Sequence, residues 1–286
     1  MNIYFWILRL AALLGHKKAR KLVKGQARAL AELREWAATL GGSQVLWFHA
    51  ASVGEFEQAR PIIERLHSEL PFRKVLLTFF SPSGYEIRKN YSGADYIFYL
   101  PSDTPYNVSR FLDVAHPEMA IFVKYEFWLN YLAQLAERGV KSYLVSAIFR
   151  RNSIFFKSYG GRWRRALDTF DQMFVQNDES RELLHSIGFD NVIVAGDTRF
   201  DRVAEIARAA KSVEIVEKFK GDSRLFVAGS TWGPDEDILL PLINANADVK
   251  FVIAPHEMDE GRIGRLLRET KGGAVRYTQC TAQSDF

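Results

Sequence analysis

Hydrophobic and polar positions alternate in a regular order from residue 44 onward. Short apolar runs, as in strands buried on both faces, are separated by stretches with apolar residues at helical spacing. The runs predict strands at Val45–His49, Lys74–Phe79, Tyr96–Tyr99, Met119–Val123, Lys141–Ser146, Met173–Val175 and Val192–Val194. The stretches between them predict helices at Phe56–Leu70, Gly84–Asn90, Tyr106–Val114, Phe127–Arg138, Trp163–Phe170 and Glu179–Ser186. This alternation predicts an α/β fold whose parallel sheet is covered by helices on both faces.

A charged helical stretch at residues 201–220 then links this domain to a second one. Beyond it, the pattern predicts strands at Arg224–Ala228 and Val249–Ile253, and helices at Asp235–Asn244 and Arg262–Arg268. Two or three strands do not complete an open α/β sheet, so we expect a second domain that is incomplete in this chain, as in a C-terminal truncation. The expected domains are residues 31–205 and residues 206–286.

The N-terminal stretch is apolar at residues 3–14 (IYFWILRLAALL) and basic after it. The apolar part is too short to cross a bilayer, which takes about 20 residues, and no positive charge precedes it as in a signal peptide. A helix lying in the membrane interface, assigned to residues 1–30, fits better, with apolar side chains in the bilayer and cations at anionic headgroups. The alternative is a first helix docked on its own domain. The cations concerned are Lys17, Lys18, Arg20, Lys21 and Lys24.

Composition narrows the class of protein without choosing a function. Of the 286 residues, 48% are hydrophobic and 25% are charged, which is typical of a globular chain. The net charge of +4 is too small to imply a nucleic-acid partner. Cys280 is the only cysteine, so the sequence excludes a disulfide framework and a cysteine-rich metal site, which fits a reducing cytoplasm.

The loop after the first predicted strand is the first candidate site. In open parallel sheets, ligands bind beyond the carboxyl ends of the strands, and the segment AASVGE (50–55) lies at such a place. Ser52 and Gly54 are small enough to let a ligand approach the backbone. Glu55 follows in the first helical turn, where an ionised carboxylate can accept a proton. The alternative role is electrostatic, because an acid at a helix start interacts favourably with the helix dipole.

A second acid occupies an equivalent place farther along the chain. In FVKYEFWLNYL (122–132) an apolar strand ends, and Glu126 follows at its carboxyl end. Two acids at equivalent strand ends favour a shared crevice more strongly than either acid alone. The alternative is a helix-start acid that forms a surface ion pair with Lys124, a contact of little energy.

The first loop also permits a hydrolase interpretation. Ala50–Gly54 is a degenerate nucleophile elbow, with alanine in place of the first glycine and Ser52 as the nucleophile. Asp197 and His256 follow in the order of an α/β-hydrolase triad. Against this interpretation, the elbow follows the first strand of the domain and lacks a glycine that a strained turn needs.

Cations and aromatic rings alternate through residues 146–167 (SAIFRRNSIFFKSYGGRWRRAL). Such a segment suits single-stranded nucleic acid, and equally a phosphorylated amphiphile whose phosphates meet the cations and whose acyl chains meet the rings. Because the N-terminus indicates a membrane surface, we favour the amphiphile and expect no nucleic acid. The alternative is a solvated helix face with its rings in the core. A non-catalytic module that binds anionic lipid would need only this segment and the N-terminal helix.

Three turns in the later half follow predicted strands. AGDTRFD (195–201) presents Arg199, a fixed cation, and AGSTWGPDED (228–237) offers Ser230, Thr231 and a helix start as a phosphate cradle. IAPHEMDEG (253–261) presents His256, which can hold a nucleotide phosphate or base, although a lone histidine in such a loop is more often structural. The sequence has no HExxH, P-loop or GxGxxG pattern, so the corresponding enzyme classes have no motif support.

Together these stretches resemble the Kdo transferases, glycosyltransferases that add 3-deoxy-D-manno-octulosonic acid to a lipid A precursor in Gram-negative bacteria. The resemblance covers nearly the whole chain in family order, from WFHAASVGEFEQARPII (47–63) through FVKYEFW (122–128), SAIFRRNS (146–153) and AGDTRFDRV (195–203) to VAGSTWGPDED (227–237). It implies a GT-B type α/β fold with two Rossmann-like domains and parallel sheets. Family members continue well past this chain's end, so the resemblance also implies that the second domain is incomplete.

The resemblance implies roles for the matching residues. Glu55 would be the general base, Glu126 the second acid of an E-x-E-x-W element, and Arg199 a stabiliser of the transition state where the family usually has lysine. It implies CMP-Kdo as donor, the lipid A precursor as acceptor, no metal or cofactor, and a place at the cytoplasmic face of the inner membrane. Lys124 replaces the first acid of the E-x-E-x-W element, and Pro255-His256-Glu257 replaces the usual R-H-P. The residues implied in substrate binding are Ser52, Gly54, Arg151, Ser153, Ser230, Thr231, Pro255, His256 and Glu257.

Overall fold

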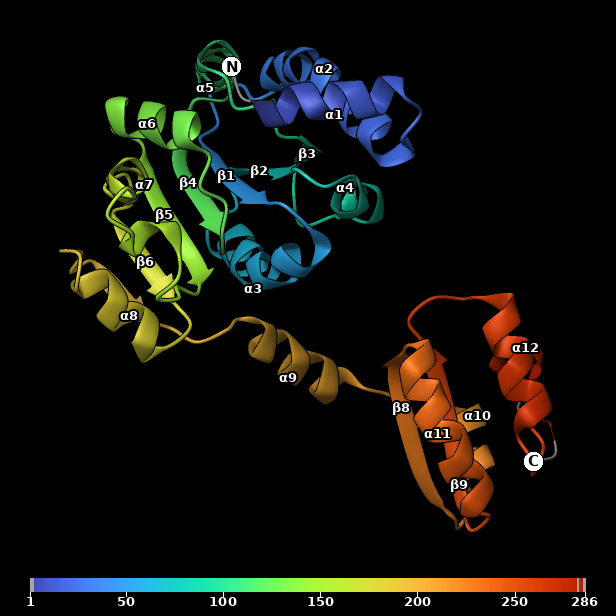
Figure 1. The fold of residues 1–286 in the computed structure, drawn as a ribbon. Coiled ribbons are helices and arrows are strands. Elements are labelled where there is room, and N and C mark those ends of the chain that lie inside the picture. Colours follow the sequence, from blue (N-terminus) through green and yellow to red (C-terminus); the bar gives the residue numbers. More distant parts are fainter. Residues whose placement is uncertain (1–2, 282, 285–286) are drawn as a thin grey trace. The chain divides into compact units, whose positions relative to one another are not determined.

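The computed structural model describes residues 3–281 and 283–284 (Figure 1). The chain forms two compact units, one ending at Arg208 and the other beginning at Ala209. This division falls inside helix α9 (Arg199–Ala209), and the boundary expected after residue 205 lies in the same helix. Residues 201–220 contain most of α9 and all of α10 (Glu214–Lys220), so the charged link is helical as expected.

The first unit is built on a seven-stranded parallel sheet with the strand order β3-β2-β1-β4-β5-β6-β7. This sheet confirms the predicted strands of the first domain. In such an order, the crevice at which ligands bind lies beyond the carboxyl ends of β1 and β4, where the order reverses. The strands are β1 Val45–Ala50, β2 Lys74–Phe79, β3 Tyr96–Tyr99, β4 Pro117–Val123, β5 Lys141–Ala147, β6 Gln172–Val175 and β7 Val192–Val194.

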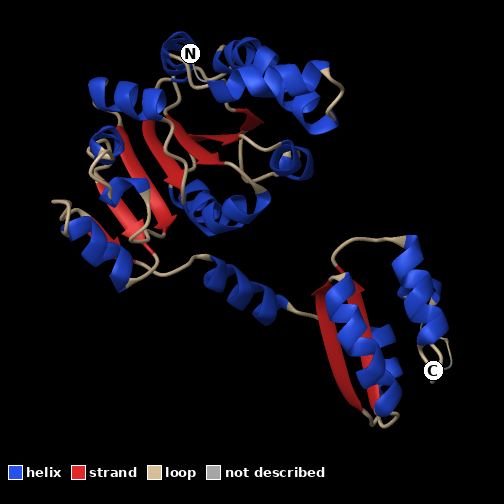
Figure 2. Cartoon of the chain, viewed as in Figure 1, coloured by secondary structure: helices blue, strands red, loops and turns tan. Residues whose placement is uncertain are grey.

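Helices cover both faces of this sheet (Figure 2). Their side chains form one hydrophobic cluster on each face, so neither face of the sheet is left to solvent. One cluster contains side chains of α3 (Val53–Glu69) and α4 (Pro82–Arg88). The other contains side chains of α5 (Pro105–Ala115), α6 (Leu129–Glu137), α7 (Gly161–Leu167) and α8 (Asp178–His185).

Strand β1 shows why the central strands are apolar. All of its residues are buried, and successive side chains enter opposite clusters. Trp47 packs against the rings of Phe111 and Tyr131, with centroids 4.7 and 5.5 Å away. Phe48 belongs to the cluster beneath α3. A polar side chain in this strand therefore needs a hydrogen-bond partner inside the protein, and His49 is such a side chain.

The expectation of one helix over residues 1–30 is wrong. Two helices, α1 (Ile3–Leu13) and α2 (Lys17–Ala37), are separated by a turn in which Gly15 has a φ of 99°, a conformation that glycine tolerates. Helix α2 docks on the first unit by burying Ala29 and Leu33 in its core. The boundary expected after residue 30 therefore falls inside a helix that is part of this unit.

Helix α1 presents a stripe of apolar side chains to solvent. Trp6, Ile7, Leu10, Leu13 and Leu14 are 54–80% exposed, and their spacing places them on one face of the helix. None of the described helices is long and apolar enough to cross a membrane.

The expected basic surface is smaller than the sequence indicated. Arg20 donates from Nε to the carbonyl of Ala12 at 2.8 Å, which satisfies the end of α1. Lys21 forms an ion pair with Glu86 at 3.1 Å.

The second unit contains a two-stranded parallel sheet of β8 (Arg224–Thr231) and β9 (Val249–Pro255). Helix α11 (Gly233–Ala245) connects the two strands, and α12 (Glu260–Glu269) follows β9. The strand–helix–strand–helix order predicted for this part of the chain is confirmed.

Candidate active site

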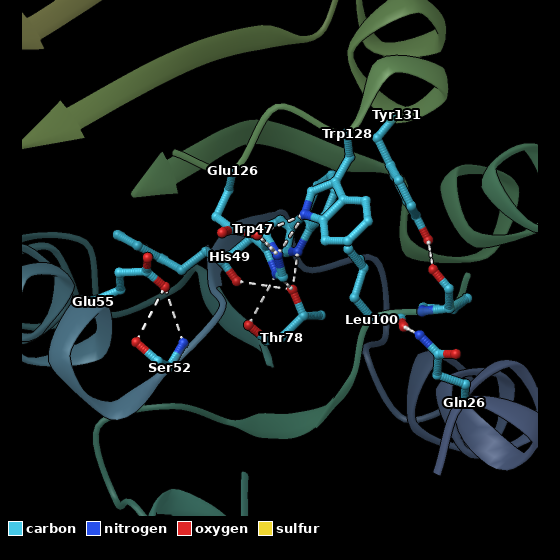
Figure 3. Close-up of polar contacts among 12 residues, drawn as sticks. Gln26, Trp47, His49, Ser52, Glu55, Thr78, Leu100, Glu126, Trp128 and Tyr131 are labelled. Atoms are coloured by element: carbon cyan, nitrogen blue, oxygen red, sulfur yellow. Dashed lines mark hydrogen bonds and ion pairs between the residues drawn. The ribbon is translucent and has the colours of Figure 1, made fainter. Parts of the chain in front are cut away.

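The carboxyl ends of β1 and β4 bring the two predicted acids to one edge of the sheet. These strands are adjacent and parallel, with His49 opposite Phe122. Glu55 follows β1 in the first turn of α3, and Glu126 follows β4 in the loop before α6. Both side chains lie on the same side of the sheet edge, beside His49 (Figure 3). The expected proximity of the two acids is thus confirmed, since the charge of Glu126 acts on Glu55, and their function stays a prediction.

The two carboxylate oxygens of Glu55 have different surroundings, one at the start of the helix and one in the crevice. Its Oε2 accepts a hydrogen bond from the backbone N–H of Ser52 at 3.0 Å, as in a capping box, and Ser52 Oγ is 3.4 Å away. Within the described part of the chain, Oε1 accepts no hydrogen bond. The helix-capping role is therefore real, and one oxygen remains available to take a proton.

The surroundings of Glu55 favour its neutral form. Burial raises the pKa of this carboxyl, and the charge of Glu126 raises it further. His49 and the backbone N–H groups of Ser52 and Ala51 act in the opposite direction, and the pKa remains raised. A carboxylate with a raised pKa holds an accepted proton more strongly, which is the property that a general base needs.

Glu126 is buried, with 9% of its surface exposed. Its Oε2 is 3.1 Å from His49 Nε2 and accepts a hydrogen bond from Trp128 Nε1 at 2.7 Å. The alternative of a surface ion pair with Lys124 is wrong, because its partners are a buried ring and an indole. It is also not a helix-start acid, since α6 begins at Leu129.

The backbone before Glu126 is strained. Lys124 has a φ of 61°, which costs about 1–3 kcal/mol for a residue with a side chain. Its N–H donates to the carbonyl of Val145 at the end of β5, which holds the turn in place. Ser146, which follows Val145, also has a positive φ, 52°. Strain at two neighbouring strand ends is typical of functional sites.

Two residues of this site were missed by the sequence reasoning. His49 is fully buried and links Glu126 to Thr78, and Trp128 contacts both His49 and Glu126. One signal was present in the sequence, because His49 is a polar residue inside an otherwise apolar strand. Its partners come from β2 and from the loop after β4, so the pattern along the chain could not name them.

A pocket of about 300 Å³ lies beside Glu126, and its wall is largely aromatic. The segment 146–167 contributes to this wall, because Ser153 precedes a short helix (Ile154–Phe156) whose residues Ile154 and Phe155 face the pocket. Arg151 is exposed, whereas Phe149 and Phe155 are buried. The alternative of rings in the core is therefore correct for these two rings. The pocket is lined by Tyr125, Glu126, Phe127, Trp128, Ile154, Phe155 and Trp163.

Arg199 is held by the neighbouring carboxylate of Asp197. Its Nε is 2.9 Å from Asp197 Oδ2, and Asp197 also accepts a hydrogen bond from Gln58 of α3 at 2.8 Å. Although burial of Asp197 acts to raise its pKa, Arg199, its backbone N–H and Gln58 lower that pKa to about 2. The cation is thus fixed against the helix that carries Glu55, with its charge partly balanced by Asp197.

The remaining candidates belong to the second unit. Ser230 Oγ lies 2.7 Å from His256 Nδ1, and the His256 ring stacks on Trp232 with centroids 4.4 Å apart. Ser230 has a φ of 60°, another strained residue at a strand end.

The expected phosphate cradle is partly occupied by protein groups. The Thr231 hydroxyl donates to Glu236, whose carboxylate also binds Arg262. The carboxylate of Asp235 accepts the N–H of Trp232 at the start of α11. Pro255 is partly buried at the end of β9, and Glu257 is exposed beyond it.

The hydrolase interpretation is not supported by these contacts. Ser52 has extended backbone dihedrals, φ −138° and ψ 173°, and not the strained turn of a nucleophile elbow. Asp197 is bound to Arg199 and Gln58, and His256 Nδ1 is beside Ser230. A triad requires the acid and the histidine to bind each other, and each has another partner here.

Solved structures that this chain resembles define its class of fold. The UDP-GlcNAc 2-epimerase from Neisseria meningitidis, solved with bound UDP-GlcNAc, covers 81% of this chain and 70% of its own at 16% identity, with a TM-score of 0.58. At such identity the likeness concerns the fold alone. Together with the parallel seven-stranded sheet, it confirms the expected α/β fold of GT-B type.

The sequence comparisons narrow this class to one family. A family model described as 3-deoxy-D-manno-octulosonic-acid transferase matches residues 20–202. The 3-deoxy-D-manno-octulosonic acid transferase of Aquifex aeolicus is 28% identical over 223 residues, covering 76% of this chain and 56% of its own length. That of Haemophilus influenzae is 23% identical over 201 residues, covering 69% and 47%. The chain belongs to the Kdo transferase family, and it spans about half the length of these curated relatives.

Proposed function

We propose that the protein transfers Kdo from CMP-Kdo to the lipid A precursor lipid IVA in lipopolysaccharide biosynthesis, with inversion at the anomeric carbon. The observation that carries this proposal is the pair of acids at the β1–β4 edge. Glu55 has a raised pKa and, among the residues that the structure describes, one carboxylate oxygen without a hydrogen bond; Glu126 lies beside it in a site with an aromatic pocket. Family membership supports the choice of Kdo as the sugar.

In the proposed reaction, Glu55 removes the proton from the primary hydroxyl of the acceptor. The oxygen forms a bond to the anomeric carbon of Kdo on the face opposite to CMP, and the bond from that carbon to the CMP phosphate oxygen breaks. The proton remains on Glu55 and later passes to solvent, and CMP leaves with the electron pair of the broken bond. The phosphate leaves as a stabilised anion, so the proposal requires no metal ion or cofactor. Arg199 stabilises the negative charge that develops.

The residues proposed to bind the substrates are those that the resemblance to the Kdo transferases implies. Ser52 and Gly54 lie at the start of α3, next to Glu55, and Arg151 and Ser153 precede the short helix whose residues Ile154 and Phe155 line the aromatic pocket. Arg151 is an exposed cation that suits a phosphate of the acceptor. For the CMP group of the donor we propose Ser230, Thr231, Pro255, His256 and Glu257.

The proposal places the protein at the cytoplasmic face of the inner membrane. The exposed apolar stripe of α1 suits the acyl region of an interface, and the exposed Lys17, Lys18 and Lys24 of α2 suit anionic headgroups. On the opposite side of α1, Phe5 packs on Trp128, with ring centroids 6.4 Å apart. Since Trp128 donates to Glu126, the helix proposed to enter the membrane directly contacts the site that must receive a lipid acceptor.

The reaction is tested by incubating the protein with CMP-Kdo and lipid IVA in mixed micelles. We expect CMP release that depends on the acceptor, together with a lipid product whose mass increases by one or more Kdo residues. The anomeric configuration of the product, read by NMR, tests inversion. Vesicle binding without either product or donor affinity would favour the other candidate, a non-catalytic module that binds anionic lipid through α1.

A matched pair of variants tests the role of Glu55. Glu55→Gln keeps a hydrogen-bond acceptor for the Ser52 N–H but cannot take the proton, so turnover should fall about 10²–10⁴-fold while the fold is retained. Glu69→Gln changes an acid of the same helix that forms an ion pair with Arg65 at the surface, so its turnover should match that of the wild type. Turnover of Glu55→Gln close to that of the wild type would exclude Glu55 as the base.

A further inference from the structure

A chain of buried polar side chains leads to Glu126 from inside the sheet. Trp47, His49 and Thr78 are each fully buried, and they come from the neighbouring strands β1 and β2. Trp47 Nε1 donates to Thr78 Oγ1 at 2.9 Å, and Thr78 Oγ1 lies 2.8 Å from His49 Nδ1. His49 Nε2 lies 3.1 Å from Glu126 Oε2. The reaction proposed above assigns no role to the first three of these residues.

The contact with Glu126 favours a proton on Nε2 of His49. An ionised carboxylate accepts hydrogen bonds and donates none, so the contact between Nε2 and Oε2 requires a proton on Nε2. Trp128 Nε1 lies 3.0 Å from His49 Nε2 and 2.7 Å from Glu126 Oε2, so its single N–H is better placed for the carboxylate. A ring with its proton on Nδ1 alone would instead bring two lone pairs together at 3.1 Å.

Thr78 holds the other side of the ring. With a proton on Nε2 alone, His49 Nδ1 accepts from the Thr78 hydroxyl at 2.8 Å, whereas a hydrogen bond to the Thr78 carbonyl, 3.1 Å away, would need a second proton on Nδ1. The ring is thus fixed at both nitrogens by residues that are themselves buried. The packing of Trp47 against Phe111 and Tyr131 fixes the indole from which this chain of hydrogen bonds begins.

We infer that His49 is a positioning residue for Glu126. Its Nε2–H, together with the N–H of Trp128, holds Glu126 Oε2 from the interior of the sheet. Within the described part of the chain, Glu126 Oε1 accepts no hydrogen bond. The two donors that hold Oε2 therefore leave Oε1 for a group that enters the crevice. Side-chain placement to within about 0.5 Å is what a catalytic constellation requires, and a donor locked by a second layer of hydrogen bonds provides it.

By holding the Glu126 carboxylate, His49 and Trp128 also fix the position of the charge that acts on Glu55. Glu126 raises the pKa of Glu55, and this effect depends on where the Glu126 carboxylate is held. The ionisable groups that act on Glu55 are Glu126 and His49. A relaxed Glu126 that turned toward solvent would act on Glu55 less strongly.

The direct test is ¹⁵N NMR of the histidine-labelled chain at neutral pH, without substrate. We expect a proton on Nε2 of His49, in slow exchange with water because the ring is fully buried. This N–H resonance should be lost or strongly shifted in Glu126→Ala and retained in Glu55→Gln. The exposed His67 serves as an internal reference for a histidine in fast exchange. An Nε2 without a proton, or an N–H resonance that is unchanged in Glu126→Ala, would overturn the inference.

Thr78 variants separate hydrogen bonding from packing. Thr78→Ser keeps the hydroxyl and should keep the Nδ1 chemical shift of His49. Thr78→Val keeps the volume and removes the hydroxyl, so it should change that shift. Equal Nδ1 shifts in the two variants would show that Thr78 does not hold the ring.

A second readout rests on the proposed function. In the transfer assay, His49→Phe keeps an aromatic ring without a donor and should lower kcat on the order of 10²-fold with little change in KM. His49→Gln retains an N–H near the position of Nε2 and should recover most of this loss. Equal losses in both variants would mean that the ring acts through packing, which contradicts the inference. Absence of transfer by the wild-type protein would refute the proposed function, and the NMR result would still decide the role of His49.

Discussion

Glu55 accepts a hydrogen bond at the start of its own helix and lies beside Glu126 in the crevice. Both interactions depend on the charge of its carboxylate. In the folded protein, burial and the charge of Glu126 raise the pKa of this carboxyl above its value in an unfolded chain, about 4.3. Below that value Glu55 is neutral in both states and the raised pKa has no cost. As the pH rises through the folded pKa, the unfolded chain releases its proton more readily, and stability is lost.

This sign gives a prediction for the free energy of unfolding. The free energy of unfolding of the wild type minus that of Glu55→Gln should fall as the pH rises from below about 4.3 to above the raised pKa, and then remain constant. Urea denaturation at a series of pH values measures it. A difference that rises with pH in this window would contradict the raised pKa.

Glu118 provides a control of opposite sign. The hydrogen bond from Arg73 lowers the pKa of Glu118, so its stabilising effect is present above the unfolded value and is lost as the pH falls through the folded pKa. The difference in the free energy of unfolding between the wild type and Glu118→Gln should therefore rise with pH.

At the level of elements, the docking of α2 depends on a close contact between Gly25 and the ring of Tyr99. A Cβ on Gly25 would lie 2.1 Å from the ring of Tyr99, at the end of β3. Gly25→Ala should therefore lower the free energy of unfolding by about 1–3 kcal/mol, because the ring and the helix cannot both keep their places. Chemical denaturation measures this change.

Gly233 is the matched control for Gly25. It begins α11, and a Cβ there meets nothing within 4 Å. Gly233→Ala should leave stability unchanged or raise it by about 0.4–1 kcal/mol. Because helix backbone preferences favour alanine over glycine, they cannot account for a loss of stability. A destabilisation of similar size in both variants would therefore contradict a specific role of the contact with Tyr99.

The apolar stripe of α1 can be tested by a single charge. Leu10→Glu places a carboxylate in the stripe and removes the gain of burying a leucine, about 1.5–3 kcal/mol, so vesicle binding should weaken about 10- to 100-fold. Sedimentation with anionic vesicles measures this affinity. Phe72 is 87% exposed in the turn after α3, and Phe72→Glu should leave binding unchanged. Equal losses in both variants would contradict a specific role of α1.

At the level of the whole molecule, the net charge of +4 has a measurable effect on membrane binding. Binding to vesicles with anionic lipid should weaken as salt rises from 0.1 to 1 M, because the screening length falls from about 10 to about 3 Å. Binding that remains at high salt comes from the apolar stripe. Binding to zwitterionic vesicles should depend little on salt. Equal salt dependence of binding to both kinds of vesicle would contradict an electrostatic contribution to membrane binding.

The periodic parts of this fold were predictable, and the site was predictable in part. The strands appear as apolar runs because a parallel sheet buries both faces, and Glu55 and Glu126 were found because they follow such runs. His49 was missed because its partner Thr78 lies on another strand, opposite it in the register. The break at Gly15 was missed because apolar and basic stretches on either side both favour helix.

The sequence by itself determined the order of strands and helices, the family and the two acids at strand ends, because each depends on a pattern that is local along the chain. Only the tertiary structure decided which residues hold these acids. Contacts of Glu126 with His49 and Trp128, and of Arg199 with Asp197 and Gln58, join residues brought together by the strand order and by loop conformation. Hydrogen bonds depend on distances in space, and a linear pattern carries no record of those distances until the sheet has assembled.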